Sequence, residues 1–343
     1  MSRSDPGLPP PWADIRPGES ADLRVRLSER YSGAPVEAPL HVVRGHGPGP
    51  TVCVTAAVHG DEINGTGAIR HLIREQRPEL QAGTLVLVPV VNMPGFERHT
   101  RYLPDRRDLN RCFPGRADGS LAARLAWSFF ERVTRHCNWG VDLHTASVRR
   151  TNYPNVRADL NHPGLARLAK AFGAEVLVHG AGPRGSLRRA ATRAGCPTLI
   201  LEAGEVWKVE ASVLEVAVRG VLNCLRHLGM LDGEPEPAAA PVEIRQTRWV
   251  RAEEGGFLEF HVRPGERLNA GDAIATATDL LGETRSVMAA EASGVVLGMT
   301  TMPSVFPGDP VYHLGLLEAS SDEPAEAGPA SVGADLHVVE YEA

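Results

Sequence analysis

The sequence predicts a mixed α/β domain followed by a smaller all-β domain. Two short runs rich in β-branched residues, 52–58 and 84–91, flank a segment with apolar residues at helical spacing, 65–76. This order of strand, helix and strand is typical of a parallel or mixed sheet. Beyond residue 246, short apolar runs alternate with glycine turns, which is typical of an all-β fold. A chain of 343 residues is long enough for about two domains.

The N-terminal part contributes two strands before the first buried one. Residues 1–22 are rich in proline, and we expect them to be flexible. Residues 23–27 alternate between apolar and polar side chains like an edge strand, 40–43 form a second strand, and 45–50 are a turn cluster. Residues 93–119 are rich in Pro, Gly, Arg and Asp, which predicts a long loop, and ordered loops of this length are often functional.

Helices and strands alternate in the rest of the α/β domain. We expect helices at 121–136, 161–173 and 210–228, strands at 139–144 and 197–202, and irregular chain at 145–160. A segment rich in proline and acidic residues then separates the two domains. The predicted organisation is a flexible N-terminus (1–22), an α/β domain (23–231), a linker (232–246), a β domain (247–317) and an acidic tail (318–343).

Composition restricts the class of function. The net charge of −6 gives no general attraction to nucleic acid or to an anionic membrane. No apolar run approaches the roughly 18 residues of a membrane span, and the N-terminus lacks the apolar region of a signal peptide. The five cysteines are odd in number and include no C-x-x-C pair, which argues against disulfides and against a thiolate zinc site. We expect a cytoplasmic protein without nucleic-acid or membrane partners, and the sequence leaves homo-oligomer formation open.

Polar residues stand where three predicted strands end. His59 follows the first buried strand and has Glu62 three residues further on, while His144 and Glu202 end two later strands. Ligands of open α/β sheets bind at the carboxyl ends of the strands, so these side chains could meet at one edge. Imidazole and carboxylate groups suit a first-row metal ion. A surface turn with a helix-capping Glu62 is the alternative for the first pair alone, and the three strand ends together favour an assembled site.

These residues carry a resemblance to a known family. Four motifs occur in order: H-G-D-E at 59–62, T-R-Y at 100–102 with D-L-N-R at 108–111, D-L-H-T at 142–145, and L-E-A-G at 201–204. Together they resemble the succinylglutamate desuccinylase/aspartoacylase family of zinc amidohydrolases, relatives of the zinc carboxypeptidases. The resemblance spans about residues 37–231 and implies a mixed sheet with helices on both faces. It would make residues 23–231 a zinc hydrolase domain.

The resemblance implies a Zn²⁺ site with an attached catalytic base. The zinc ligands would be His59, Glu62 and His144, which leave a fourth position for water. The metal would lower the pKa of that water and polarise the scissile carbonyl. Glu202 would be the general base that takes the proton of the water and passes it to the departing amine. Glu205, three residues on, is the rival for this role.

The same resemblance assigns substrate-side residues. Arg101 matches the arginine that helps to hold the developing oxyanion, and Asn110 with Arg111 matches the pair that receives a substrate carboxylate. A solvated arginine-rich loop is the alternative interpretation of this segment. Further residues match the substrate-side stretches more loosely: Arg150, Tyr153, Arg157 and Arg188.

The expected activity is zinc-dependent hydrolysis of the amide bond of a small N-acyl amino acid. The sequence reads E-A-G-E at 202–205 where aspartoacylase has E-V-G-P, and its C-terminal part does not resemble the domain that completes the aspartoacylase pocket. The acyl group and the amino acid therefore stay open, and N-acetyl-diaminobutyrate, a substrate of related bacterial deacetylases, is among the candidates. The alternatives are a metallocarboxypeptidase acting on short peptides and a non-catalytic protein that binds a metal or metabolite.

The predicted β domain resembles the barrel-sandwich hybrids of biotinyl and lipoyl carriers. Such carriers attach their group to a lysine at a hairpin tip, and the two lysines of this chain, Lys170 and Lys208, both lie outside residues 247–317. A swinging-arm function is therefore excluded. We expect this domain to be a structural or oligomerising appendage, or a lid over the active site.

Overall fold

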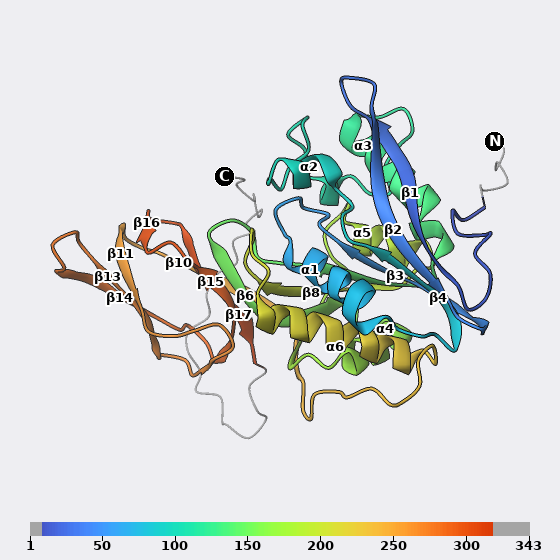
Figure 1. The fold of residues 1–343 in the computed structure, drawn as a ribbon. Helices are drawn as coiled ribbons and strands as arrows, with labels where there is room; N and C mark the ends of the chain where they lie inside the picture. Colours follow the sequence, from blue (N-terminus) through green and yellow to red (C-terminus); the bar gives the residue numbers. More distant parts are fainter. Residues whose placement is uncertain (1–8, 318–343) are drawn as a thin grey trace.

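The computed structural model describes residues 9–317, and these form two sheets with helices packed on the larger one (Figure 1). The larger sheet has 13 strands and the smaller one four. The predicted tail at 318–343 lies outside the described residues. Part of the N-terminal segment that was expected to be flexible is ordered, because Trp12 and Ile15 are buried against the core.

The centre of the large sheet is parallel and its first edge is antiparallel. The parallel strands neighbour one another in the order β4 (Ala82–Val88), β3 (Gly47–Ala56), β5 (Trp139–His144) and β8 (Thr198–Gly204). β2 (Pro35–Arg44) pairs antiparallel with β4, and β1 (Ser20–Glu29) forms the edge. The predicted mixed sheet and its edge strand are confirmed. The expected turn cluster at 45–50 is partly wrong, because β3 already begins at Gly47.

Helices cover both faces of the sheet because the side chains of its buried strands alternate between two cores. In β3, Val52 and Val54 face one core and Cys53 faces the other. The first core is covered by α1 (Asn64–His71, continued by a π-helical turn at Leu72–Gln76), α4 (Pro163–Phe172) and α6 (Ala211–His227). The second is covered by α3 (Leu121–Arg132, followed by a 3₁₀ turn at Thr134–His136) and α5 (Leu187–Arg193). Within residues 9–317, none of the helices has the length and apolarity that crossing a membrane requires.

Between residues 120 and 231, two strands and one helix were not expected from the sequence. β6 (Arg150–Ala158) replaces the irregular chain predicted at 145–160, and β7 (Val176–His179) and α5 follow later. β6 does not show the apolar alternation of a half-buried strand, because most of its residues are polar. Its pairing with β8 also shifts register between Asn152 and Asn155, next to Pro154. β6 is held in place by hydrogen bonding to β8 on one side and to a C-terminal strand on the other.

The long segment at 93–119 is mostly loop, as expected, but contains two short helical turns. α2 (Met93–Glu97) is capped by Asn92, whose side chain accepts from the Gly95 backbone N–H at 2.9 Å. A 3₁₀ turn at Leu109–Arg111 is capped by Asp108, which accepts from the Asn110 N–H at 2.7 Å. These caps fix the loop where it passes over the sheet edge.

Residues 242–317, which we call the C-terminal region, contain strands and no helix in the structure. β15 (Gly294–Thr300), β17 (Pro310–Leu316) and β10 (Gln246–Arg251) extend the large sheet from β6, with β12 (Arg267–Leu268) paired to β15 and β9 (Val242–Ile244) to β7. The small sheet is β14 (Thr284–Ala289), β13 (Ala273–Thr278), β11 (Gly256–Phe260) and β16 (Ser304–Val305). One core, which includes Tyr312 and Ile274, lies between the two sheets. Because the large sheet is continuous through β6 and β15, the domain boundaries and the barrel-sandwich assignment stay proposals.

Candidate metal and substrate site

The parallel strands bring the predicted residues to one edge of the sheet. His144, the last residue of β5, is the register partner of Glu202 in β8. His59 lies three residues beyond the end of β3, in a turn where Ala57 adopts a left-handed φ of 49°. Gly60 is required in this turn, because a Cβ there would lie 2.0 Å from the carbonyl carbon of Gly95.

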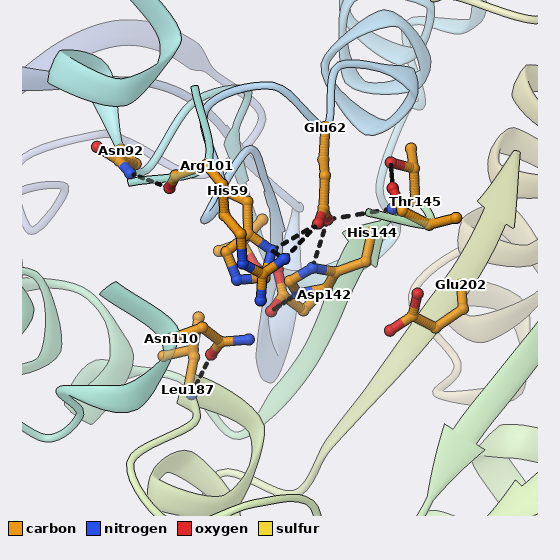
Figure 2. A network of polar contacts seen from close by, with 12 residues as sticks. His59, Glu62, Asn92, Arg101, Asn110, Asp142, His144, Thr145, Leu187 and Glu202 are labelled. Carbon is orange, nitrogen blue, oxygen red and sulfur yellow. Dashed lines mark hydrogen bonds and ion pairs between the residues drawn. The ribbon is translucent and has the colours of Figure 1, made fainter. Parts of the chain in front are cut away.

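Two histidines converge on one carboxylate. The Nδ1 atom of His59 is 2.7 Å from Oε1 of Glu62, and Nδ1 of His144 is 2.8 Å from Oε2. All three side chains are buried, and their ligand atoms lie within 4.8 Å of one another. Figure 2 shows Glu62 reaching toward both rings from its own loop. We call these three residues the His–Glu–His cluster.

Two aspartates hold the outer nitrogens of the rings. His144 Nε2 is 2.8 Å from Asp142 Oδ2, and His59 Nε2 is 3.2 Å from Asp108 Oδ1. Asp142 in turn accepts from the Thr55 hydroxyl at 2.7 Å. Carboxylates in this position fix the tautomer and orientation of ligating histidines, so Nδ1 is the atom that each ring presents inward.

The charges of the cluster favour a cation. Burial opposes the ionisation of Glu62, but His59 and His144 outweigh it and hold the pKa of this carboxyl well below its usual range. Burial also opposes protonation of His144, yet Asp142 and Glu62 raise its pKa well above the ordinary value. Positive charge on the imidazole rings thus offsets the negative charge of the buried carboxylates of Glu62 and Asp142. Two imidazole nitrogens and a carboxylate are also the donors of catalytic zinc sites, so the residues present fit that metal.

Arg101 joins the cluster from the long loop. Its Nη1 is 3.2 Å from Oε1 of Glu62 and its Nη2 is 2.8 Å from Oδ2 of Asp108. The side chain of Asn92 donates to the Arg101 carbonyl at 3.3 Å and ties this part of the loop to α2. The guanidinium that the sequence pointed to therefore lies beside the predicted ligands.

Asn110 and Arg111 lie at the same edge, next to α5. Asn110 Oδ1 accepts from the Leu187 N–H at 2.8 Å, and Figure 2 shows its amide nitrogen pointing toward His59 and Asp142. Arg111 lies at the rim: its side chain is 38% exposed and its Nη1 is 3.9 Å from Asp108 Oδ2. This position suits a charged substrate group that enters from solvent.

The two candidate bases have different surroundings. Glu202 is the register partner of His144 and is labelled beside the cluster in Figure 2, and its Oε2 accepts from Nδ2 of Asn152 at 3.1 Å. The Glu205 carboxylate instead pairs with Lys208 at 2.9 Å. The arrangement favours Glu202 over its rival.

The more loosely matched residues have separate environments. Arg188 is buried, and its Nη1 has no hydrogen-bond partner within residues 9–317. Burial, and then the charge of Arg157, lower the pKa of Arg188 to about 10. Arg150 lies over the ring of Trp249 at 4.6 Å. Tyr153 donates to Glu175 and lines a cavity near β7 and β9, so the structure does not bring it to the His–Glu–His cluster.

Sequence reasoning missed several residues that shape the site. Asp142 and Asp108 belong to the motifs named above, but no role was predicted for them. A signal existed for Asp142, because it lies two residues from His144 in one strand and therefore shares a face with it. No pattern in the sequence pointed to a role for Trp207. Its backbone N–H donates to the Asp61 carbonyl at 2.9 Å and its indole to the His99 carbonyl at 3.0 Å. It thereby ties the turn of His59 to the loop of Arg101.

The site and a matching family model together assign the chain to a protein family. A buried group of two histidines and one glutamate offers the donors that a catalytic metal site uses, at the edge where ligands of mixed α/β sheets bind. The model of the succinylglutamate desuccinylase/aspartoacylase catalytic domain matches residues 48–228. The chain belongs to this family, and the resemblance inferred from its motifs is confirmed.

Individual relatives extend the likeness beyond the catalytic domain. The chain is 30% identical over 306 residues to the N-alpha-acetyl-L-2,4-diaminobutyric acid deacetylase of Halomonas elongata, covering 84% of this chain and 88% of the relative. It is 31% identical to a succinylglutamate desuccinylase/aspartoacylase from Rhodobacter sphaeroides, with a TM-score of 0.73 and coverage of 87% of this chain and 96% of that one. The product-bound ectoine utilization protein EutE (DoeB) from Ruegeria pomeroyi has 27% identity, a TM-score of 0.77 and coverage of 88% and 96%. Matches of this length include at least part of the C-terminal region.

Proposed function

We propose that this protein is a zinc-dependent deacylase that hydrolyses the amide bond of a small N-acyl amino acid and releases a carboxylate and a free amine. The observation that carries the proposal is the buried His–Glu–His cluster with Glu202 at the neighbouring strand end. Membership of the family and the likeness to a deacetylase support it. Its partner would be this small-molecule substrate, and we keep the cytoplasm as its proposed location.

The zinc would be held by Nδ1 of His59, Nδ1 of His144 and the carboxylate of Glu62. When bound, such a cation supplies Lewis acidity for polarising a carbonyl and for activating water. Asp142 and Asp108 keep both rings in the orientation that presents Nδ1, because each holds an Nε2 atom. Glu62 is in turn held by the Thr145 backbone N–H at 3.2 Å.

Glu202 moves the proton. Its carboxylate takes a proton from the attacking water and delivers it to the amine nitrogen as the amide bond breaks, which is the work of a general acid and base. The register of β5 and β8 sets this carboxylate beside His144. Arg101 stabilises negative charge on the carbonyl oxygen, since a guanidinium already oriented by Asp108 needs little reorganisation to donate there.

Arginines and an amide bind the carboxylate of the substrate. Asn110 and Arg111 at the rim offer an amide and a planar guanidinium fork, which suit a carboxylate. Arg188 adds a buried guanidinium whose Nη1 has no partner within the described residues. A buried cation of this kind is costly unless an anion pairs with it, so a bound substrate carboxylate would complete the site. Arg150 and Arg157 add positive charge on β6.

A substrate panel tests this function. Zinc-loaded protein and its Glu202→Gln variant are assayed on N-acetyl-2,4-diaminobutyrate, N-acetylaspartate, N-succinylglutamate and short peptides, with release of free amine as the readout. We expect turnover of an N-acyl amino acid by the wild type and its loss in the variant. Cleavage of the peptides alone would make the protein a carboxypeptidase, and turnover of none of them would contradict the proposal.

A further inference from the structure

Glu202 has a side-chain partner on the unexpected strand β6. β6 runs antiparallel to β8, and Asn152 is the register partner of Gly204, two residues from Glu202. The side chains of Asn152 and Glu202 are therefore diagonal neighbours on one face of the sheet. This placement explains the 3.1 Å hydrogen bond from Asn152 Nδ2 to Glu202 Oε2.

The C-terminal region packs against the other side of Asn152. β15 pairs antiparallel with β6, with Gly298 opposite Asn152 and Thr300 opposite Arg150. A Cβ at position 298 would lie 2.4 Å from Oδ1 of Asn152 and 2.7 Å from the Thr151 carbonyl oxygen. Glycine at 298 therefore leaves the space that the Asn152 amide occupies.

We propose that Asn152 is a positioning residue for the carboxylate of Glu202, and that Gly298 of the C-terminal region keeps the Asn152 amide in place. The inference rests on the proposed role of Glu202 as the base. A glutamate side chain has several rotatable bonds, and a fixed donor on one oxygen restricts them so that the carboxylate faces the reaction centre. The C-terminal region would thereby contribute to catalysis through one strand pairing, without touching the substrate.

Variants of Asn152 test the first step. Asn152→Asp keeps the size of the side chain but removes the donor, and Asn152→Ala removes the amide altogether. Loss of a hydrogen bond to a charged group predicts a fall in kcat of about 10- to 100-fold. KM and zinc content should stay the same, because these variants leave the cluster and the carboxylate-binding residues intact. Thr151→Val, one residue away on the opposite face of β6, is the matched control and should leave kcat unchanged.

A double-mutant cycle tests the role of Gly298. Gly298→Ala should lower kcat in the wild type by displacing the amide, and should lower it less in the Asn152→Ala background, where only the contact with the Thr151 carbonyl oxygen remains. Gly255→Ala is the control in the same region, because the nearest atoms to a Cβ there are 3.4 Å away. If the effects of Gly298→Ala and Asn152→Ala on kcat multiply, Gly298 does not act through Asn152 and that part of the proposal is wrong.

Crystal structures of the wild type and of Asn152→Ala give a readout that does not depend on activity. We expect one Glu202 conformer hydrogen-bonded to Asn152 in the wild type and a rotated or disordered carboxylate in the variant. An unchanged Glu202 in Asn152→Ala would overturn the inference, whatever the substrate. Failure of the proposed function looks different: the wild type would turn over no N-acyl amino acid, while the conformation of Glu202 would still depend on Asn152.

Discussion

His144 and Glu202 are register partners across the parallel strands β5 and β8, so a predicted metal ligand and the predicted base leave the sheet side by side. The same ladder pairs Leu143 with Leu201, both of which are buried in the core. The packing of these leucines thus fixes the spacing of the polar residues that follow them. Any slip of this register would move the two functional side chains apart.

The first prediction concerns the metal. Purified protein should contain about one zinc per chain, as expected for a mononuclear site, and His144→Ala should abolish binding. Asp142→Asn should keep the ligands but weaken affinity by roughly 10- to 100-fold, because it disturbs the carboxylate that orients His144. Metal analysis and chelator competition measure both effects.

His71 on α1 offers a control for the metal experiment. It lies outside the cluster and hydrogen-bonds Gln76, so His71→Ala should retain the full zinc content. Full zinc occupancy in His144→Ala would exclude this histidine as a ligand.

The second prediction concerns the carboxylate of the substrate. If Arg111 binds it, then Arg111→Ala, or replacement of the substrate carboxylate by a carboxamide, should each lower kcat/KM by about 10- to 100-fold, and both changes together by little more than one. Arg101→Ala should lower kcat on both substrates, because it acts on the oxyanion. Steady-state kinetics of the two enzymes on the two substrates complete the cycle. If the free-energy costs of Arg111→Ala and of the carboxamide substrate simply add, Arg111 does not bind the carboxylate, and its segment is a solvated arginine-rich loop.

The third prediction is that Arg188 lowers the stability of the fold while it contributes to substrate binding. Its guanidinium is buried with an Nη1 atom that has no partner within residues 9–317, so Arg188→Met should raise the free energy of unfolding by on the order of 1 kcal/mol. The same change should raise KM at least tenfold if Arg188 binds the substrate carboxylate. Thermal melts and kinetics give the two readouts. A destabilised variant with an unchanged KM would assign Arg188 to the fold alone.

The sequence predicted the elements whose apolar pattern is set by the sheet itself. The strand at 139–144 matches β5 in both bounds, because its alternate residues Val141 and Leu143 pack into the core. It did not predict β6, whose polar residues are ordered by pairing with β8 and β15. The apolar pattern of a sequence segment predicts a strand only where the side chains of that segment form part of the core.

The same distinction applies to the site. His59, Glu62 and His144 were found from short motifs, because each motif stands at a strand end that the pattern located. Asn152 was not found, because its contact with Glu202 depends on the pairing of β6 with β8, and β6 itself was not expected from the sequence. Trp207 was missed for a similar reason, since its partners lie in two loops far away in the sequence.

The last prediction concerns acid sensitivity at the junction of β6 with the C-terminal region. His313 is buried, and its ring stacks on Trp249 with centroids 4.6 Å apart. Burial, followed by the charges of Arg157 and Arg150, lowers the pKa of His313 from 6.5 to about 3. The folded protein therefore holds this ring neutral at pH values where the unfolded chain binds a proton.

The sign of the effect follows from this difference. The stabilising contribution of neutral His313 is fully present above pH 6.5 and is lost progressively as the pH falls toward 3. Between pH 7 and pH 5 the loss should be on the order of 2 kcal/mol. His313→Phe keeps a ring to stack on Trp249 but cannot titrate, so its free energy of unfolding should fall less over this range. Urea denaturation at pH 7 and pH 5 measures the difference, with the exposed His227→Phe as the control. Equal pH dependence in wild type and His313→Phe would mean that His313 is protonated in the folded protein.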